Sequence, residues 1–157
     1  MILGIGCDIL DIKRFQKACT DTFIKRVFTV AESDFANTLK GKRKINFLAK
    51  RFAAKEAFSK ACGTGIGSFM NWQDIEILND KNGAPTVNLS DNLKKNIQKR
   101  FKCRKFQIHI SLSDDAEAMA FALFDFSIAH PGKHKDNKPS CKKCIQNRLA
   151  VFFVECQ

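Results

Sequence analysis

The sequence predicts an α+β fold: a single domain in which a mainly antiparallel sheet packs against a long central helix. Two kinds of periodicity support this prediction. Residues 2–10, 106–113 and 118–125 alternate between two faces as strands do, whereas residues 46–62 carry apolar side chains at helical spacing. The elements follow one another as a strand, several helices, a hairpin, a helix and two strands, an order typical of an α+β domain.

The first predicted strand carries a candidate functional side chain. Ile5, Cys7 and Ile9 share an apolar face, and Asp8 lies on the opposite face beside two glycines, where a backbone or a ligand can approach closely. Asp8 could instead end the strand and cap the following helix, but Asp11 is the better N-cap candidate.

Capping signals mark the helices that follow. Thr29 and Glu32 match a capping box, and Gly41 stands where a helix stop is expected. We interpret residues 42–44 as a short basic loop before the long helix, which ends at Gly63.

The second half of the chain begins with a predicted hairpin over residues 74–89. Pro85 lacks an N–H group, so it should begin the return strand or lie at an edge. Either Ser90 or Asp91 is expected to cap the next helix.

Composition limits the class of protein. The chain has 157 residues, of which 45% are hydrophobic, and a net charge of +11, which favours a polyanionic partner: nucleic acid, a phosphorylated cofactor or an acidic protein. No apolar run approaches the ~20 residues needed to cross a bilayer, and the N-terminus does not resemble a signal peptide. We therefore expect no membrane partner, a cytoplasmic location and reduced thiols for the seven scattered cysteines.

The segment 51–67 is the most informative part of the chain. It is predicted to be a helix that runs into a glycine-rich loop, which places Phe52, Glu56 and Lys60 on one helical stripe. A carboxylate and an ammonium one turn apart could hold a metal and steady a phosphate, or could form an ordinary surface ion pair.

Three segments match, in order and spacing, the motifs of one known family: residues 4–9 (GIGCDI), 47–67 and 109–113 (HISLS). Together they resemble the holo-acyl-carrier-protein synthases, which are 4′-phosphopantetheinyl transferases. The resemblance covers residues 1–126, which would form the transferase domain. Residues 127–157 would be a basic C-terminal extension and not a separate domain.

The resemblance implies an activity: transfer of the 4′-phosphopantetheine group of coenzyme A to a serine of apo acyl carrier protein, in support of fatty acid biosynthesis. Adenosine 3′,5′-bisphosphate would be the other product, and the enzyme would be a homotrimer with active sites between subunits. Two alternatives remain open. One is the same chemistry on a carrier domain of another synthase. The other is a basic nucleic-acid-binding module, although no Lys/Arg–aromatic recognition motif appears, so no nucleic-acid partner is expected.

The resemblance also implies roles for individual residues. Asp8 and Glu56 would bind Mg²⁺, for which carboxylates are suitable ligands, and Lys60 would stabilise the departing oxygen as the third catalytic residue. His109, which shares a strand face with Ser111, would help to form a neighbouring subunit's pocket. The residues implied to bind coenzyme A are Arg51, Phe52, Lys60, Gly63, Gly65, Ile66, Pro85, His109 and Ser111.

Several points stay open within this scheme. The loop of residues 63–67 could bind an anion through backbone amides, or could be a helix C-cap followed by a turn. Lys55 could meet the phosphates of coenzyme A or lie on a solvated helix face, and Asp114 stands where many family members carry a second histidine. Either a metal-bound water or a carboxylate would accept the proton of the attacking serine.

Acyl carrier protein is acidic, so a basic docking surface is expected. Lys13, Arg14 and Lys17 lie on one side of the first predicted helix, and Arg26 follows. The resemblance supports Arg14 as a contact with the carrier protein.

The C-terminal extension contains a possible metal site. His130, His134, Cys141 and Cys144 could supply two nitrogen and two sulfur ligands to zinc, but their spacing fits no familiar zinc finger. The favoured interpretation is a flexible basic linker ahead of an apolar end.

Overall fold

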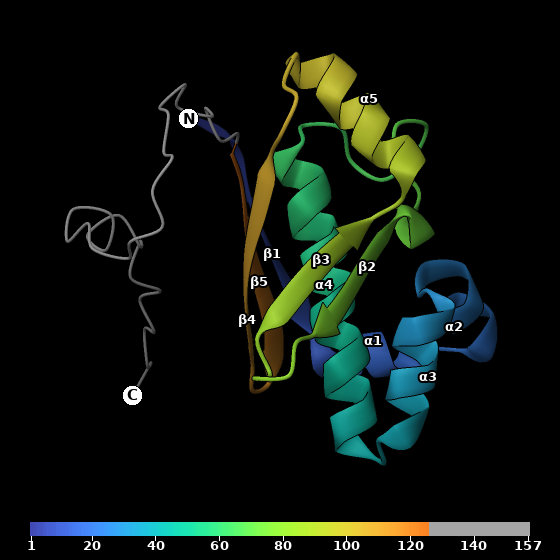
Figure 1. Cartoon of the computed structure of the whole chain (residues 1–157). Helices are drawn as coiled ribbons and strands as arrows, with labels where there is room; N and C mark the ends of the chain where they lie inside the picture. The colour runs from blue at the N-terminus through green and yellow to red at the C-terminus, as the bar shows by residue number, and fades with distance from the viewer. Residues whose placement is uncertain (126–157) are drawn as a thin grey trace.

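A three-stranded antiparallel sheet packs along one side of a long helix (Figure 1). The computed structural model describes residues 1–125. The sheet has the strand order β1-β5-β4, and β1 and β5 both lie against the helix α4. These elements are β1 (Ile2–Asp11), α4 (Lys42–Ala61), β4 (Gln107–Asp114) and β5 (Glu117–Asp125). The predicted α+β class, with a central helix and a mainly antiparallel sheet, is confirmed.

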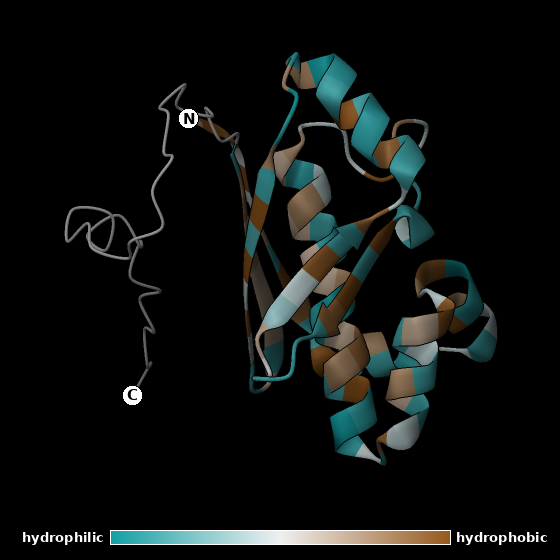
Figure 2. Ribbon diagram, viewed as in Figure 1, coloured by the Kyte–Doolittle hydropathy of each residue, from teal (hydrophilic) through white to brown (hydrophobic). Residues whose placement is uncertain are grey.

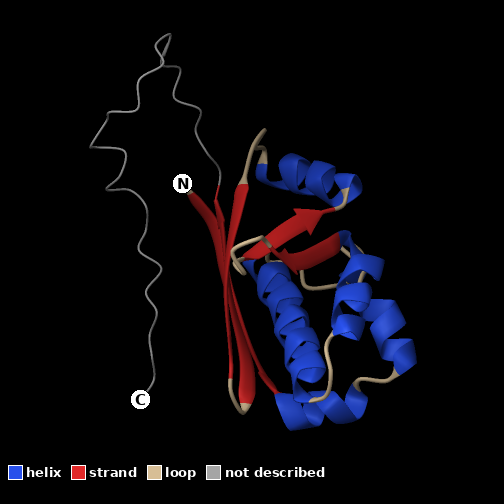
Figure 3. Cartoon of the chain, turned by 60° about the horizontal axis from the view of Figure 1, so that its bottom comes forward, coloured by secondary structure: helices blue, strands red, loops and turns tan. Residues whose placement is uncertain are grey.

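Shorter helices and a separate two-stranded hairpin complete the described part of the fold. They are α1 (Ile12–Ala18), α2 (Asp21–Val27), α3 (Val30–Thr38), the 3-10 turn η1 (Trp72–Asp74), β2 (Ile75–Asn79), β3 (Pro85–Leu89) and α5 (Asp91–Phe101). In Figure 3 the three-stranded sheet is seen nearly edge-on, and all the helices lie on one side of it. Within residues 1–125, the opposite face of this sheet is therefore not covered.

Two glycines allow β1 to lie directly on α4. A Cβ atom built at Gly4 would come within 1.9 Å of the carbonyl oxygen of Ala61, and one at Gly6 would come within 2.1 Å of that of Ala57. No side chain fits in either place. The sequence predicted that a backbone or a ligand could approach closely beside Asp8. The structure shows that the backbone of α4 does so.

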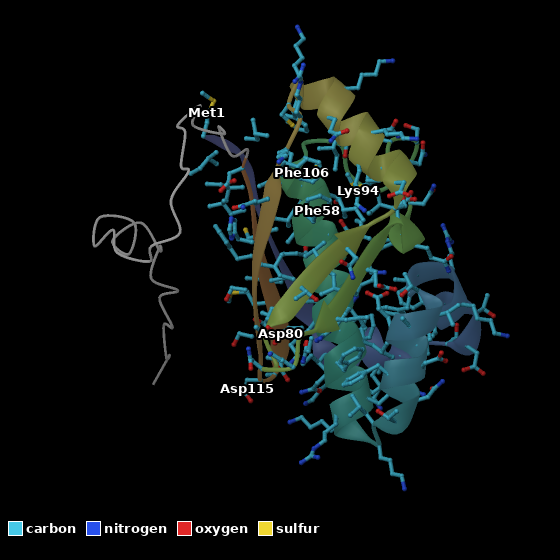
Figure 4. All side chains as sticks on the ribbon, in the orientation of Figure 1. Met1, Phe58, Asp80, Lys94, Phe106 and Asp115 are labelled. Carbon is cyan, nitrogen blue, oxygen red and sulfur yellow. The ribbon has the colours of Figure 1, made fainter. Side chains whose placement is uncertain are left out.

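The core consists of two groups of buried side chains, and α4 contributes to both. The group under the sheet and α5 includes Phe58 of α4, and the partly buried Phe106, just before β4, packs against it (Figure 4). Their rings meet Phe124 at centroid distances of 6.3 and 5.2 Å. Leu93 and Ile97 enter this group from α5, whose other residues are mostly hydrophilic (Figure 2).

The outer face of the sheet is exposed, and on β1 and β5 it is apolar. Ile5 and Ile9 of β1 are 54% and 58% exposed, and Met119 and Phe121 of β5 are 48% and 44% exposed. The apolar face of the first strand, on which Cys7 was placed, is thus the outer face. The core is instead lined by small residues at alternate positions of β5, namely Ala118, Ala120 and Ala122.

The capping predictions are confirmed by hydrogen bonds. The Asp11 carboxylate accepts from the Arg14 amide at 2.6 Å, and Thr29 and Glu32 form a reciprocal capping box. Of the two candidates before α5, Ser90 is the cap, because its hydroxyl accepts from the Leu93 amide at 3.1 Å.

The start of the long helix differs from the prediction. The helix α3 ends with Leu39 as its C-cap, so Gly41 does not stop that helix and instead becomes the N-cap of α4, with a φ of +54°. The amide of Lys44 donates to the carbonyl of Gly41 at 3.2 Å. Residues 42–44 therefore form the first helical turn and not a loop, and this turn continues directly into Ile45 and Phe47, which pack in the core.

Candidate active site

Asp8 of β1 and Lys60 of α4 lie together where the strand crosses the end of the helix. The Lys60 ammonium lies 2.7 Å from a carboxylate oxygen of Asp8 and donates to the carbonyl of Cys7 at 3.3 Å. The hydrogen bond to Asp8 raises the pKa of Lys60. The side chain of Lys60 is 52% exposed, so it is accessible to a ligand.

Glu56 lies one helical turn before Lys60 and completes a three-residue cluster. Burial raises the pKa of the Glu56 carboxyl, and the nearby negative charge of Asp8 raises it further, while Lys60 opposes both effects. The two carboxylates therefore interact electrostatically. The structure brings together the three residues that the sequence singled out as catalytic.

An open pocket of about 810 Å³ lies beside Glu56. It collects residues from four parts of the chain: the end of α2, the helix α4, the glycine-rich loop and the turn η1 with the residue before it. They are Arg26, Glu56, Ile66, Gly67, Asn71, Trp72, Gln73 and Asp74. Sequence reasoning found Glu56, Ile66 and Arg26, but missed the wall of residues 71–74. Trp72, the only tryptophan of the chain, was the one available signal.

Phe52 supports this wall from behind. Its ring stacks on Trp72 with a centroid distance of 4.8 Å and an interplanar angle of 22°. It also lies 5.7 Å from the ring of Phe15 and 5.6 Å from that of Phe23. An aromatic cluster therefore joins α1, α2 and α4 to the pocket wall.

The glycine-rich loop begins as a helix C-cap. Gly63 has a φ of +66°. Its amide donates to the carbonyl of Lys60 at 2.9 Å, and the Thr64 amide donates to the carbonyl of Ser59 at 3.3 Å, which together form a Schellman motif. The amides of Gly65 and Gly67 also donate to carbonyls of this chain, at 3.3 and 2.9 Å. Of the two interpretations left open, the C-cap and turn is therefore the one supported, because these amides already have partners.

Arg51 lies on a different side of α4, against β2. Its Nε donates to the carbonyl of Ile77 at 3.3 Å, its Nη2 bonds to Asn79, and its guanidinium lies 3.9 Å from the centroid of the Phe47 ring. Arg51 is only 3% exposed, and burial lowers its pKa to about 10. Arg51, which was predicted to bind coenzyme A, is therefore not part of the cluster around Glu56.

Both expectations for Lys55 are wrong. It is fully buried, and its ammonium forms an ion pair with Glu32 at 2.7 Å. Burial lowers the pKa of Lys55 despite this partner. Lys55 is therefore neither on a solvated helix face nor free to meet a phosphate.

His109 and Ser111 are exposed on the outer face of the sheet, whereas Asp8 faces α4 on the inner face. His109 lies 3.3 Å from the Asp125 carboxylate. One chain therefore does not bring these two residues to the Glu56 cluster. Pro85, the first residue of β3, also lies outside the pocket lining.

Asp114, at the end of β4, has structural partners. Its carboxylate pairs with Lys50 and accepts from the Asn46 side chain at 2.6 Å. Partial burial opposes its ionisation, but the hydrogen bonds from Lys50 and Asn46 outweigh this effect, so the pKa of Asp114 lies below its ordinary value.

The predicted docking residues are exposed. Lys13, Arg14 and Lys17 project from α1, and Arg26 on α2 lines the same pocket as Glu56. Arg26 thus places one of the predicted docking residues at the pocket that Glu56 lines.

The carboxylates of Asp8 and Glu56 are candidate ligands for a metal ion. Among residues 1–125, no three His, Cys, Asp or Glu side chains are arranged to hold a metal ion. Mg²⁺ commonly binds through one or two carboxylates and completes its shell with water and substrate phosphate. Asp8 and Glu56 therefore fit Mg²⁺ that is bound together with a diphosphate.

The fold and the cluster define an α+β domain with two carboxylates and a lysine beside an open pocket. The chain belongs to the 4′-phosphopantetheinyl transferase superfamily, whose family model matches residues 4–122.

Relatives agree with this assignment along most of their length. The holo-[acyl-carrier-protein] synthase of Pelagibacter ubique is 46% identical over 115 residues, which cover 73% of this chain and 88% of that protein. The holo-(acyl-carrier-protein) synthase of Bacillus anthracis, solved in complex with CoA, is 39% identical with a TM-score of 0.69 over 81% of this chain and 99% of that chain. The synthase structure from Neisseria meningitidis is 34% identical with a TM-score of 0.70, over 80% of this chain and 99% of that chain.

Two further predictions concern membrane spans and the zinc ligands of the C-terminal extension. Within residues 1–125, no helix has both the length and the apolar character needed to cross a bilayer. The candidate zinc ligands His130, His134, Cys141 and Cys144 lie outside the described residues, as does the extension 127–157.

Proposed function

We propose that this protein transfers the 4′-phosphopantetheine group of coenzyme A to a serine of apo acyl carrier protein, in support of fatty acid biosynthesis. The observation that carries the proposal is the cluster of Asp8, Glu56 and Lys60 beside an open pocket, in a chain of this superfamily. The relatives named above are holo-acyl-carrier-protein synthases, and one was solved with CoA.

In the proposed reaction, the serine hydroxyl oxygen attacks the phosphorus that carries pantetheine. A new P–O bond forms as the diphosphate P–O bond breaks, and adenosine 3′,5′-bisphosphate leaves with the bonding electrons. The serine proton passes to a base, for which a carboxylate or a metal-bound water are the two candidates. Such a transfer depends mainly on positioning and on neutralisation of phosphate charge.

The chain's own groups suit these tasks. Asp8 and Glu56 would hold Mg²⁺, which when bound offsets negative charge on the diphosphate. Lys60, with its exposed ammonium, would donate to the departing oxygen and stabilise the charge that develops there. In this state Lys60 would exchange its contact with Asp8 for one with the phosphate.

Coenzyme A would occupy the pocket beside Glu56. Ile66 and the supporting ring of Phe52 would provide its apolar part, with the loop of Gly63 and Gly65 at one side. Pro85 would contact a part of the cofactor farther from the diphosphate. Arg51, which is 3% exposed, would first have to exchange its bonds to Ile77 and Asn79 for one with the cofactor.

We further propose that the active enzyme is a homotrimer. The exposed apolar outer face of the sheet, with Ile5, Ile9, Met119 and Phe121, is the surface that another subunit would cover. Because His109 and Ser111 lie on this same face, association would carry them to the pocket of a neighbouring subunit. This arrangement explains why one chain leaves them far from Asp8.

The acidic carrier protein would dock on α1 and α2 through Lys13, Arg14, Lys17 and Arg26. Arg26 lines the Glu56 pocket, so a carrier bound there would present its serine near the diphosphate.

A cytoplasmic location is part of the proposal. Cys7, Cys19, Cys62 and Cys103, the cysteines among the described residues, are all free thiols. Burial raises the pKa of Cys62 to about 12, so this thiol should be unreactive.

The nucleic-acid-binding alternative draws on the net charge of +11, which an acidic carrier protein and a phosphorylated cofactor account for equally well. Phe15, Phe28, Phe47, Phe58 and Phe124 are buried in the core and cannot stack on bases.

Chromatography of adenosine 3′,5′-bisphosphate tests the proposed reaction. Release of this product should require both coenzyme A and apo carrier protein, and should stop when a chelator removes Mg²⁺. Release that continues without any carrier would indicate hydrolysis and contradict the transfer.

A further inference from the structure

The ammonium of Lys55 is buried at a junction of four segments. Lys55 is 0% exposed, and its Nζ donates to Glu32 at 2.7 Å, to the carbonyl of Val27 at 2.9 Å and to the carbonyl of Trp72 at 3.0 Å. An ammonium has three protons, so these three oxygens satisfy it completely.

Glu32 is equally well satisfied. One carboxylate oxygen accepts from Lys55 and from the Thr29 amide at 2.8 Å, and the other accepts from the Ile77 amide at 2.8 Å. The ion pair thus joins the end of α2, the start of α3, the strand β2 and the turn η1 to α4.

This junction coincides with the wall of the candidate pocket. Trp72 lines the pocket together with Glu56, the residue that follows Lys55 in α4. The side chain of Gln73, the next residue of the wall, donates to the carbonyls of Lys25 and Phe28 at 2.7 and 3.2 Å. The wall is therefore fixed both to α4 and to the helix that carries Arg26.

Stability alone gives a weak reason for such an arrangement. Taking two charges out of water is costly, and apolar side chains of similar volume often stabilise a core equally well. An apolar residue at position 55 could fill the space but could not bond to the carbonyls of Val27 and Trp72.

We propose that Lys55 is a positioning residue that holds the Trp72 wall and the end of α2 at the Glu56 pocket, and so sets the affinity for coenzyme A. This inference rests on the proposed function, since it takes that pocket as the coenzyme A site. Lys55 itself touches no substrate; it acts through the wall.

The chain offers a direct reporter of this contact. Trp72 is its only tryptophan, so intrinsic fluorescence reports on the pocket wall alone. Acrylamide quenching measures the exposure of this ring without any ligand or activity.

The test compares two double variants of the full chain. Glu32→Gln/Lys55→Met removes both buried charges together, so that neither is left unpaired, and the carboxamide oxygen introduced at position 32 can still accept from the Ile77 amide. Lys50→Met/Asp114→Asn is the matched control, because it removes another lysine–carboxylate pair whose lysine lies on α4, here with its partner on β4. Circular dichroism and size-exclusion chromatography would establish that each is folded.

We expect the quenching constant of Trp72 to rise about twofold in Glu32→Gln/Lys55→Met. The Kd for coenzyme A should rise about tenfold, with a similar rise in KM and less than a threefold change in kcat. The control should stay within twofold of the wild type in each quantity. A folded Glu32→Gln/Lys55→Met variant with wild-type quenching and wild-type Kd would overturn the proposal.

The two arms separate this inference from the proposed function. Quenching requires no coenzyme A, so it tests whether Lys55 positions Trp72 even in a protein that does not bind coenzyme A. Failure of the wild type to bind coenzyme A would instead contradict the proposed function. If the double variant does not fold, ¹⁵N-lysine NMR of the wild type decides. The Lys55 ammonium protons should be protected from exchange and should shift on addition of coenzyme A. Rapid exchange with water would overturn the inference.

Discussion

The ammonium of Lys60 lies 2.7 Å from the carboxylate of Asp8, although 52 residues separate them in the chain. Gly4 and Gly6 make this contact possible by letting β1 lie on the backbone of α4. Glu56 adds a second carboxylate one turn earlier. The proposed transfer depends on this group of three charges.

Removal of either carboxylate should slow transfer strongly without unfolding the protein. We expect Asp8→Asn or Glu56→Gln to lower kcat/KM at least about 100-fold, because the loss of one preorganised charged group in a catalytic site commonly costs this much. Steady-state kinetics with apo carrier protein measures the loss. Asp91→Asn, at an exposed carboxylate on α5, is the control. Full activity in a folded Asp8 or Glu56 variant would remove that residue from the site.

Lys60→Met should separate catalysis from stability. The pair with Asp8 is half exposed on the lysine side, so its loss should change the free energy of unfolding by less than about 1 kcal/mol. We expect kcat to fall about 100-fold because the departing oxygen loses its cation. Urea unfolding and turnover measured on the same preparation provide the comparison. An unchanged rate would leave Lys60 as a partner of Asp8 only.

A charge on the outer face of the sheet should dissociate the proposed trimer. Phe121→Glu would place a carboxylate in an apolar interface, and each pocket would then lose His109 and Ser111 of its neighbour. Light scattering should report monomers, with a loss of activity of at least tenfold at about 1 μM protein. Val30→Glu, at an exposed apolar position on α3, should change neither quantity. A wild type that is already monomeric and fully active would refute the trimer.

Docking of the carrier should depend on Arg14. Arg14→Glu reverses a charge on the exposed side of α1, so we expect KM for the carrier to rise about tenfold, while KM for coenzyme A stays the same. The effect should shrink at about 0.5 M salt, because exposed charges are screened. Insensitivity to both the substitution and salt would argue against docking on this helix.

Asp114 should contribute stability that depends on pH. Its pKa is lowered in the folded protein, so its stabilising effect is present above the ordinary value of 3.8 and is lost as the pH falls through the folded pKa. Asp114→Asn should therefore cost about 1 kcal/mol at pH 7 and much less near pH 3. Urea unfolding at the two pH values gives the difference. An equal cost at both would mean that the ionised carboxylate is not what stabilises the fold.

Local sequence patterns predicted much of the fold and the charged cluster. Alternation located the strands, and helical spacing joined Glu56 to Lys60. The glycines beside Asp8 indicated a close contact, because a strand without Cβ atoms can accept a neighbouring backbone.

The rest depended on tertiary contacts that local patterns do not contain. Lys55 was expected at the surface because lysine is rarely buried, yet Glu32, 23 residues earlier, provides its partner. Residues 42–44 looked like a loop because of their charge, but they form the first turn of α4, which continues into Ile45 and Phe47 in the core. The Trp72 wall has no periodic signal, since its position is set by hydrogen bonds to α2 and α4.

The most direct test of the central claim is the intact mass of apo acyl carrier protein after incubation with this protein, coenzyme A and Mg²⁺. We predict that the carrier gains one phosphopantetheine group on its serine, and that neither the Glu56→Gln variant nor a chelator-treated sample produces the gain. No gain from the folded wild-type protein, or an equal gain from Glu56→Gln, would contradict the account.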